Sequence, residues 1–442
     1  MSKGRLIICA LLTAYVSTTA YGEDLLDVYH LALRNDPKFE VARYSLKAIQ
    51  EKQPQSLAAL LPTVSASGVN NLTRAQSQFS TSQPTNRYVH AWNWSLQLTQ
   101  PLIRMQNLYA YKESSVAVEQ AQAQFTLAEQ DMILRTAEAY FGVLASRESI
   151  KVAESELLAM EEQLMLAQRG YEKGVASMIE VRDGQSRVAL AKSHRVAAQN
   201  ELDIKLAELG KIVDEVPTRL AALDAAVALP SPEPNDQQAW VSQARDHNAA
   251  VQAARSGLLV AEASVGKARA EHAPTLDLVA SYGENYSSGS TTMPSDFASR
   301  GQSKQVGLQF NIPLFAGGGS NARVGEAVAV KYRAGAELEL AQRQAATEAK
   351  LAFAGVVNGL SQITALIAAV EASRSAVEGN HAGYKAGIYS NIDVLNAEQQ
   401  YHTVKRDLLK VRYETLLQAL KLKAAAGILN VDDLVRVNAL FK

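Results

Sequence analysis

The chain of 442 residues has a net charge of −1, 47% hydrophobic residues and only 6% aromatic residues. The near-neutral charge provides no electrostatic field that would favour nucleic acid or anionic lipid as a partner. The composition favours alanine-rich helices over a globular enzyme with a thick aromatic core, and the length allows two or more ordinary domains.

Residues 1–22 have the pattern of a secretory signal peptide. Lys3 and Arg5 precede an apolar stretch, and Ala20-Tyr21-Gly22 fits a small-x-small cleavage site. The stretch is shorter than the roughly 18 apolar residues that a membrane anchor needs, so an anchor is the weaker interpretation. Cys9, the only cysteine, lies in this leader, and the mature chain is expected to have no thiol. No later apolar run is expected to be long enough for a transmembrane helix.

The first half of the chain, residues 23–216, predicts helices, two strands and a long helical hairpin. The expected elements are helical segments interrupted at Pro37, strands at about 63–74 and 87–100, a helix over 102–169, a tip at about 170–178 and a return helix over about 177–211. At about 1.5 Å per residue the helix over 102–169 would be about 100 Å long. Its two apolar stripes suit a helix that packs against two neighbours, as in a wall of helices.

The second half, residues 237–426, repeats this order after a proline-rich connector at 217–236. Pro274 and Pro313 follow Pro62 and Pro101 at the same offset of 212 residues (274 − 62; 313 − 101). Expected elements are strands at about 275–283 and 303–312, a Gly/Ser-rich loop over 283–304, a tip at about 383–391 and a C-terminal segment at 427–442. The chain is therefore a tandem repeat.

The strands predict a small membrane β part in a mainly α protein. Apolar and polar residues alternate along them, and we expect a lipid-facing set of Trp92, Trp94, Leu96, Leu98, Leu308 and Phe310. Four strands cannot close a membrane barrel, which needs about eight. Three chains would supply the strands of a 12-stranded barrel, continued by a helical barrel. The alternative is an ordinary soluble hairpin that packs on the helices.

The two tips share a sequence pattern. Residues 171–185 (YEKGVASMIEVRDGQ) return as 384–398 (YKAGIYSNIDVLNAE), 213 residues later (384 − 171). Gly174 and Gly387 supply the backbone freedom for a turn. The Ser-x-x-acid step that follows each glycine resembles a capping box.

The acidic residues at the tips have two interpretations. Glu180 and Asp393 can simply start the helices that follow the turns. Alternatively Glu180, Asp183 and Asp393, three copies of each in a trimer, form a ring around a constriction. Crowded carboxylates attract cations, so the second interpretation predicts a cation-preferring pore.

No catalytic set emerges from the sequence. The seven histidines show no metal-ligand spacing, and no metal or cofactor is expected. Gly317-Gly318-Gly319-Ser320 lacks the lysine of a phosphate-binding loop and is interpreted as a flexible joint between a strand and a helix. An envelope hydrolase is disfavoured because no nucleophile and base are paired, and we expect no enzyme activity.

Four segments carry a resemblance to a known family. They are residues 135–141 (RTAEAYF), 312–315 (IPLF) followed by Gly317-Gly318, 384–396 (YKAGIYSNIDVLN), and 426–429 (AGIL) with 432–434 (DDL). In this order, and within the tandem repeat, the chain resembles the TolC family of outer-membrane channel-tunnel proteins. The resemblance implies a homotrimer with a 12-stranded barrel, a long helical tunnel in the periplasm, a closable tip and an equatorial segment at 427–442. It also implies a periplasmic adaptor protein and an inner-membrane transporter as partners.

The resemblance also implies how the tip is held shut. In the family a tyrosine, a basic residue and acidic residues link neighbouring helices; here Tyr384 and Asp393 match. Tyr389 stands where the basic residue is expected, and Asn396 where the second acid is expected. We therefore expect a weaker, hydrogen-bonded latch made by Tyr384, Tyr389 and Asn396.

Four basic residues flank the tips and are expected to contact the adaptor, unless they are ordinary solvated charges. They are Arg169, Lys173, Arg182 and Lys385. The predicted function is a passive outer-membrane exit channel for small molecules or unfolded polypeptides, gated at its periplasmic tips. The alternative is a periplasmic coiled-coil scaffold without a pore.

Overall fold

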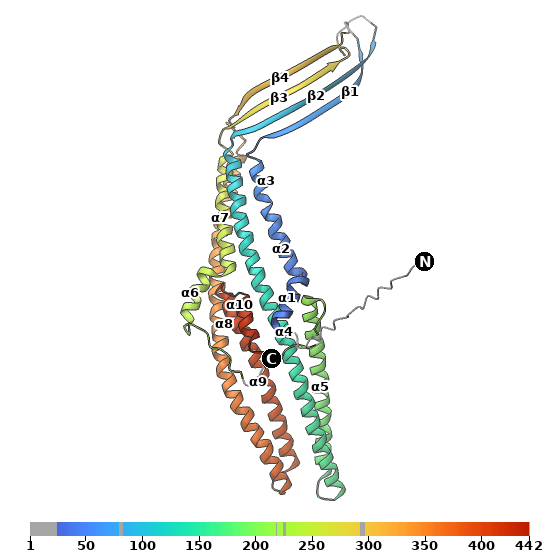
Figure 1. Cartoon of the computed structure of the whole chain (residues 1–442), viewed down its shortest axis with the longest axis vertical. Helices are drawn as coiled ribbons and strands as arrows, with labels where there is room; N and C mark the ends of the chain where they lie inside the picture. Colours follow the sequence, from blue (N-terminus) through green and yellow to red (C-terminus); the bar gives the residue numbers. More distant parts are fainter. Residues whose placement is uncertain (1–23, 79–82, 218, 224–226, 292–296, 442) are drawn as a thin grey trace, which may run out of the picture.

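The computed structural model describes residues 24–441 except 79–82, 218, 224–226 and 292–296. The expected signal peptide at 1–22 lies outside the described residues. The molecule is long and narrow, with a sheet at one end and two helical turns at the other (Figure 1). Short helices gather around its middle.

Two long helices, one in each repeat, run along most of the molecule. α4 spans Met105–Glu172 and α8 spans Gly319–Lys385, with 68 and 67 residues. Each folds back through a tight turn into a helix about half as long, α5 (Met178–Val213) and α9 (Asn391–Ala425). The first long helix begins and ends three residues later than expected, because the preceding strand continues through Ile103.

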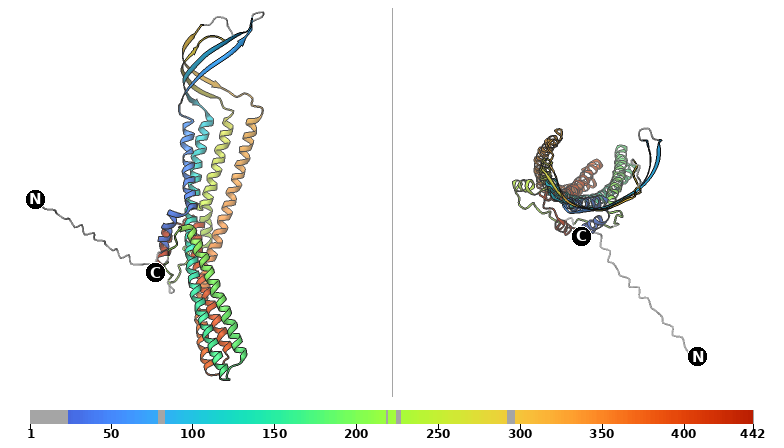
Figure 2. Two further views of the ribbon diagram at one scale, coloured as in Figure 1. Left: turned by 90° about the vertical axis from the view of Figure 1, so that its right-hand side faces the viewer. Right: turned by 90° about the horizontal axis from the view of Figure 1, so that it is seen from above.

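Short helices precede the strands of each repeat. They are α1 (Leu25–Asn35), α2 (Pro37–Gln50) and α3 (Lys52–Ala58) in the first repeat, and α6 (Gln237–His247) and α7 (Ala249–Ala270) in the second. The break expected at Pro37 occurs there, and the Asp36 side chain caps α2 by accepting from the Lys38 amide at 3.1 Å. Next to the sheet, the helices form a curved wall in which α7 packs between α4 and α8 (Figure 2).

The sheet is antiparallel, in the order β1-β2-β3-β4, so β1 and β4 form its edges. The strands are β1 (Thr63–Ser77), β2 (Thr85–Ile103), β3 (Thr275–Ser287) and β4 (Ser299–Asn311). All four extend farther from the helices than expected, because polar residues that read as loop continue the hydrogen-bonded ladder. The two ends of the loop expected over 283–304, residues 283–287 and 299–304, are therefore strand, and Lys304 lies within β4. β4 also ends at Asn311, one residue before the expected 312.

The strand register brings the predicted lipid-facing residues to one face. Directly paired residues of antiparallel strands point to the same side. Leu96 pairs with Tyr282, which pairs with Lys304, and Leu98 pairs with Ala280, which pairs with Val306. By alternation, Trp92, Trp94, Leu308 and Phe310 share this side, which we call the apolar face. The opposite face is lined mainly by Ser, Asn and Gln.

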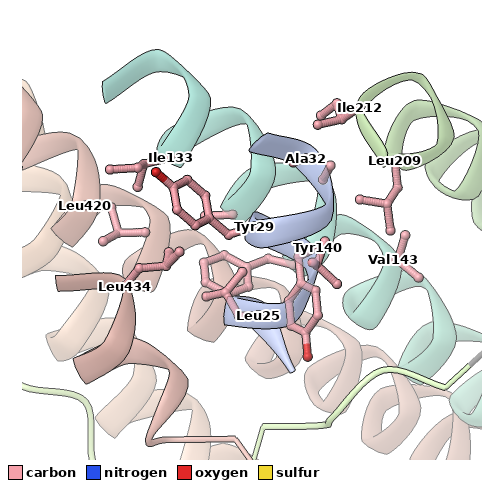
Figure 3. Packing of buried hydrophobic residues seen from close by; sticks show 14 of the residues in the cluster. Leu25, Tyr29, Ala32, Ile133, Tyr140, Val143, Leu209, Ile212, Leu420 and Leu434 are labelled. Atoms are coloured by element: carbon pink, nitrogen blue, oxygen red, sulfur yellow. The ribbon is translucent and has the colours of Figure 1, made fainter. Parts of the chain in front are cut away.

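The largest apolar core lies at mid-length, where both repeats meet the ends of the chain (Figure 3). Leu25 of α1, Tyr140 of α4 and Leu434 of α10 (Val431–Asn438) are completely buried there. The Tyr140 hydroxyl donates to the Ala221 carbonyl at 2.9 Å. The core fixes the level from which the two hairpins project.

One expectation about membrane helices is wrong. α8 contains an 18-residue window that is apolar enough to cross a membrane, by length and composition only. Only 11% of that window is buried. The helix, with 67 residues, is about three times longer than a span of about 20 residues requires. It lies at one edge of the helical wall, so its apolar side is a surface suited to a protein neighbour.

Candidate functional site at the helical tips

Both hairpins close with the same turn. Gly174 and Gly387 have φ angles of 77° and 73°, in the left-handed region that glycine adopts without strain. The amide that follows each glycine donates to a carbonyl five residues earlier, at 2.9 Å in both turns. This is the Schellman motif, which satisfies carbonyls left free at a helix end.

A capping box follows each turn. Ser177 accepts from the Glu180 amide at 3.3 Å, and the Glu180 carboxylate accepts from the Ser177 amide at 3.2 Å. Ser390 and Asp393 make the same pair of bonds, at 3.3 and 2.9 Å. The hydrogen bonds from Ser390 hold the pKa of the Asp393 carboxyl below its usual value. Both acids therefore start helices, which is the simpler of the two interpretations of these residues.

Tyr389 packs within its own hairpin. Its ring lies against Gly383, which is buried, and a Cβ atom at that position would overlap the ring. In the first tip the corresponding Gly170 lies beside Ala176, whose Cβ would be 2.9 Å from an added Cβ. These two glycines were not predicted from the sequence, although their spacing of 213 residues (383 − 170) matches that of the tips.

Arg187 links the two hairpins, and this role was not predicted from the sequence either. From α5 it donates to the side-chain oxygens of Asn396, at 2.8 Å, and Gln399, at 2.9 Å, both on α9. Its Nε donates to the Asp183 carboxylate at 3.0 Å. Asp183 is therefore neutralised within the chain, and the predicted latch residue Asn396 is held by an arginine from the other repeat. The spacing of four between Asp183 and Arg187 was the available signal.

Tyr384, a residue of the predicted latch, is half-buried at the second tip. It makes no hydrogen bond through its hydroxyl among the residues that the structure describes. Burial raises the pKa of the Tyr384 hydroxyl, and the negative charge of Glu180 raises it further. The two tips thus lie close enough for Glu180 of one repeat to act on Tyr384 of the other.

Buried ionisable groups lie farther along the hairpins. Glu398 is flanked by His381, at 3.0 Å, and His402, at 3.6 Å. Burial alone would raise the pKa of the Glu398 carboxyl, but hydrogen bonds from the two histidines outweigh it and hold that pKa below its usual value. In the first hairpin the buried Glu156 lies 3.2 Å from His194. No group of three or more potential metal ligands is found in the described part of the chain.

The contact between α9 and the first hairpin mixes apolar and unpaired polar groups. Leu395 packs on Met160 and Val188. Nearer the tip, the fully buried Asn391 has neither its side-chain nitrogen nor its oxygen hydrogen-bonded, and the Gln163 side-chain oxygen is also unpaired. Each unpaired group costs about 1–3 kcal/mol. This contact is therefore a weak part of the helical bundle.

The four basic residues expected to contact an adaptor are exposed. Arg169, Lys173, Arg182 and Lys385 have no carboxylate within 4.0 Å among the described residues. Arg182 donates only to Gln185, one turn along the same helix, at 3.0 Å. The tips thus carry exposed basic side chains that are not ion-paired within the described part of the chain.

Known proteins share this whole arrangement. Secretion and outer-membrane proteins align with nearly the full chain: alkaline protease secretion protein AprF of Pseudomonas aeruginosa is 28% identical over 432 residues, covering 96% of this chain and 88% of that protein. Outer membrane protein TolC of Escherichia coli is 28% identical over 445 residues, covering 99% and 89%. The Campylobacter jejuni CmeC outer membrane channel has the same fold, with a TM-score of 0.79, 16% identity, and 95% of this chain and 89% of that chain covered.

The family model named Outer membrane efflux protein matches residues 28–213 and 240–428, one match for each repeat. The two matches include both hairpins and all four strands. The chain belongs to the outer membrane efflux protein family and is an outer-membrane protein of the efflux and secretion channel class.

Proposed function

We propose that three copies of this chain form one passive channel, with a 12-stranded barrel in the outer membrane and a helical tunnel in the periplasm. The observation that carries the proposal is a sheet with two unpaired edges, β1 and β4, that continues into a curved wall of helices. Strand edges in a membrane must be paired, because no water is present to satisfy the backbone. Four strands from each of three chains close the barrel.

The helical part supports the same assembly. α8 lies at one edge of the wall and has an apolar stretch of which little is buried in the single chain. Such a surface is stabilised when a neighbouring chain covers it. The wall of each chain is then one third of a tunnel.

The sheet faces support a membrane position. The apolar face, with Trp92, Trp94, Leu96, Leu98, Leu308 and Phe310, turns to lipid, and the polar face lines the pore. Tryptophan is favoured at the border of a membrane, where its ring is apolar and its N–H reaches water.

The tips form the gate of this channel. Arg187 bonds Asn396 and Gln399 and holds the second hairpin against the first, and the contact behind it contains unpaired polar groups. A small number of hydrogen bonds therefore controls a weak interface. Glu180 and Asp393 give the constriction its negative charge, since Asp183 is paired with Arg187.

Energy for export comes from partners, because the sequence has no nucleotide-binding motif. We propose a periplasmic adaptor protein, which contacts the exposed basic residues of the tips, and an inner-membrane transporter. Relatives are named for secretion of proteases and for a toluene efflux pump, which supports export of unfolded polypeptides or small molecules.

Reconstitution of the purified protein into planar lipid bilayers tests the proposal. A trimeric mass together with discrete, cation-preferring current steps supports the channel. A protein that keeps its fold but gives no current steps would instead support the coiled-coil scaffold without a pore.

A further inference from the structure

The apolar face of the sheet contains a groove of about 470 Å³. Its walls come from three adjacent strands, and we call it the β2–β4 groove. The side chains that line it on the apolar face are Leu96, Leu98, Ala280, Tyr282, Lys304 and Val306. The groove lies within the sheet of one chain, and two of its residues, Lys304 and Val306, belong to the edge strand β4, whose outer side the proposed trimer would pair with the next chain.

The groove exists because a small residue lies between larger ones. Ala280 pairs with Leu98 on one side and with Val306 on the other. Its methyl group leaves a hollow between the two longer side chains. The hollow is apolar and is lined by residues of three adjacent strands, which fits a hydrocarbon chain.

Lys304 closes the groove at the end that points away from the helices. It pairs with Tyr282 across the strands, and its Nζ lies 5.5 Å from the centre of the tyrosine ring. No carboxylate lies within 4.0 Å of it among the described residues. Arg300 lies on the same face of β4, four residues farther from the helices, and by contrast is ion-paired with Glu284. Lys304 thus carries a positive charge without a partner.

Lys304 lies on the apolar face between residues that differ in type toward the helices and away from them. Toward the helices the apolar face carries Leu308 and Phe310. Away from them it carries aromatic residues, with Trp92 stacked on Tyr286 at 5.8 Å between ring centres. Aromatic and basic side chains gather where the hydrocarbon core of a membrane meets the headgroups. If the helices are periplasmic, this boundary lies in the outer leaflet.

We propose that the β2–β4 groove binds a lipid with a phosphate headgroup from the outer leaflet: one acyl chain lies over Ala280, and the phosphate pairs with Lys304. The inference rests on the proposed position of the sheet in the membrane. The net charge of −1 gives no long-range attraction to anionic lipid, so the selectivity comes from this one lysine and the groove beside it.

Native mass spectrometry of the delipidated protein tests the site, with dioleoyl-phosphatidic acid as the probe. Dioleoyl-phosphatidylcholine tests whether the phosphate must be unshielded, and inorganic phosphate tests whether the lipid chain is needed. We expect phosphatidic acid to bind about fivefold better than phosphatidylcholine, the ratio for about 1 kcal/mol per basic residue at a membrane surface. Inorganic phosphate at the same concentration should not displace it; displacement would identify a free-phosphate site and overturn the proposal.

Two variants change the site by different means. Lys304→Gln removes the charge and should abolish the preference for phosphatidic acid. Ala280→Leu fills the groove with the charge retained and should lower the amount of both lipids bound. Lys350→Gln, an exposed lysine on α8, is the matched control and should change neither.

Equal binding of phosphatidic acid by the wild type and Lys304→Gln would overturn the proposal. Current steps in planar bilayers, measured on the same samples, separate this failure from a failure of the channel. A variant that conducts but has lost its lipid preference supports the site, and a wild type that conducts without any preference contradicts the site alone.

Discussion

At the scale of single residues, Arg187 links the two repeats near the tips. Its guanidinium reaches Asn396 and Gln399 on α9 while Asp183 fixes its orientation. Asparagine and glutamine accept hydrogen bonds but carry no charge, so the link is weaker than a buried ion pair. It suits a gate that a partner opens.

Arg187→Ala should make the channel open more often. Loss of a partly exposed link of about 1 kcal/mol raises the ratio of open to closed states about fivefold. Single-channel recording measures the open probability. Arg182→Ala is the matched control, because Arg182 bonds only within its own helix, at 3.0 Å to Gln185. Equal open probabilities for the two variants would refute the role of Arg187.

Glu398 predicts a pH dependence of stability. Its pKa is held below the ordinary value, so its contribution to stability is present above the unfolded pKa of about 4.3 and is lost as the pH falls through the folded value. We expect the free energy of unfolding to decrease below about pH 4.3, less so in Glu398→Gln. Urea unfolding as a function of pH measures it.

The control for this prediction is Glu378→Gln, which replaces an exposed glutamate of the same hairpin. Wild type and control should lose stability alike as the pH falls, whereas Glu398→Gln, which lacks the contribution of the carboxylate above about pH 4.3, should be the least sensitive to pH. Identical pH profiles for all three proteins would count against the buried carboxylate.

At the scale of elements, the two tips share one turn but differ in packing. Gly383 accommodates the Tyr389 ring, whereas Gly170 accommodates only the methyl group of Ala176. Gly383→Ala should lower the stability by about 1–3 kcal/mol, the cost of overpacking. Chemical denaturation measures this loss.

The double variant Gly383→Ala/Tyr389→Ala tests whether overlap with the Tyr389 ring causes the loss of stability. Removal of the ring removes the overlap, so the double variant should be more stable than Gly383→Ala alone. If the double variant is the less stable of the two, Tyr389 stabilises the protein in another way.

The long elements could be predicted from sequence and the contacts at the tips could not. The repeat, the proline break at Pro37, the turns at Gly174 and Gly387 and the alternation of the strands are local patterns. Strand ends were predicted too short, because pairing with a neighbour overrides the polar composition. The bonds from Arg187 to Asn396 and Gln399 join residues more than 200 positions apart, and no pattern within either tip indicates them.

At the scale of the whole molecule, the unpaired edges β1 and β4 predict that three chains can be cross-linked into one covalent species. Ser67 of β1 and Ser303 of β4 lie in one row across the sheet, since Ser67 pairs with Ser95, Ser95 with Gly283 and Gly283 with Ser303. In a Ser67→Cys/Ser303→Cys variant, thiol cross-linkers of increasing length should join chains into species of up to three chains, because the stagger that closes a barrel offsets the two rows by several residues. Denaturing gel electrophoresis reads the result.

The control is Ser67→Cys/Ser95→Cys, in which the hydroxyls replaced lie 3.0 Å apart in one chain. It should cross-link only within the chain. Bands larger than three chains, or no band above one chain in the test variant, would contradict the proposed barrel.

The most direct test of the central claim is the single-channel current of an Asp393→Cys variant before and after a bulky methanethiosulfonate reagent is added from the side of the tips. The only native cysteine, Cys9, lies in the expected signal peptide, so the mature wild type, which is expected to have no thiol, serves as the unreactive control. If three tips surround the constriction, the reagent should lower the current of the variant in up to three steps and leave the wild type unchanged. An unchanged current in a fully labelled variant would contradict a gate at the tips.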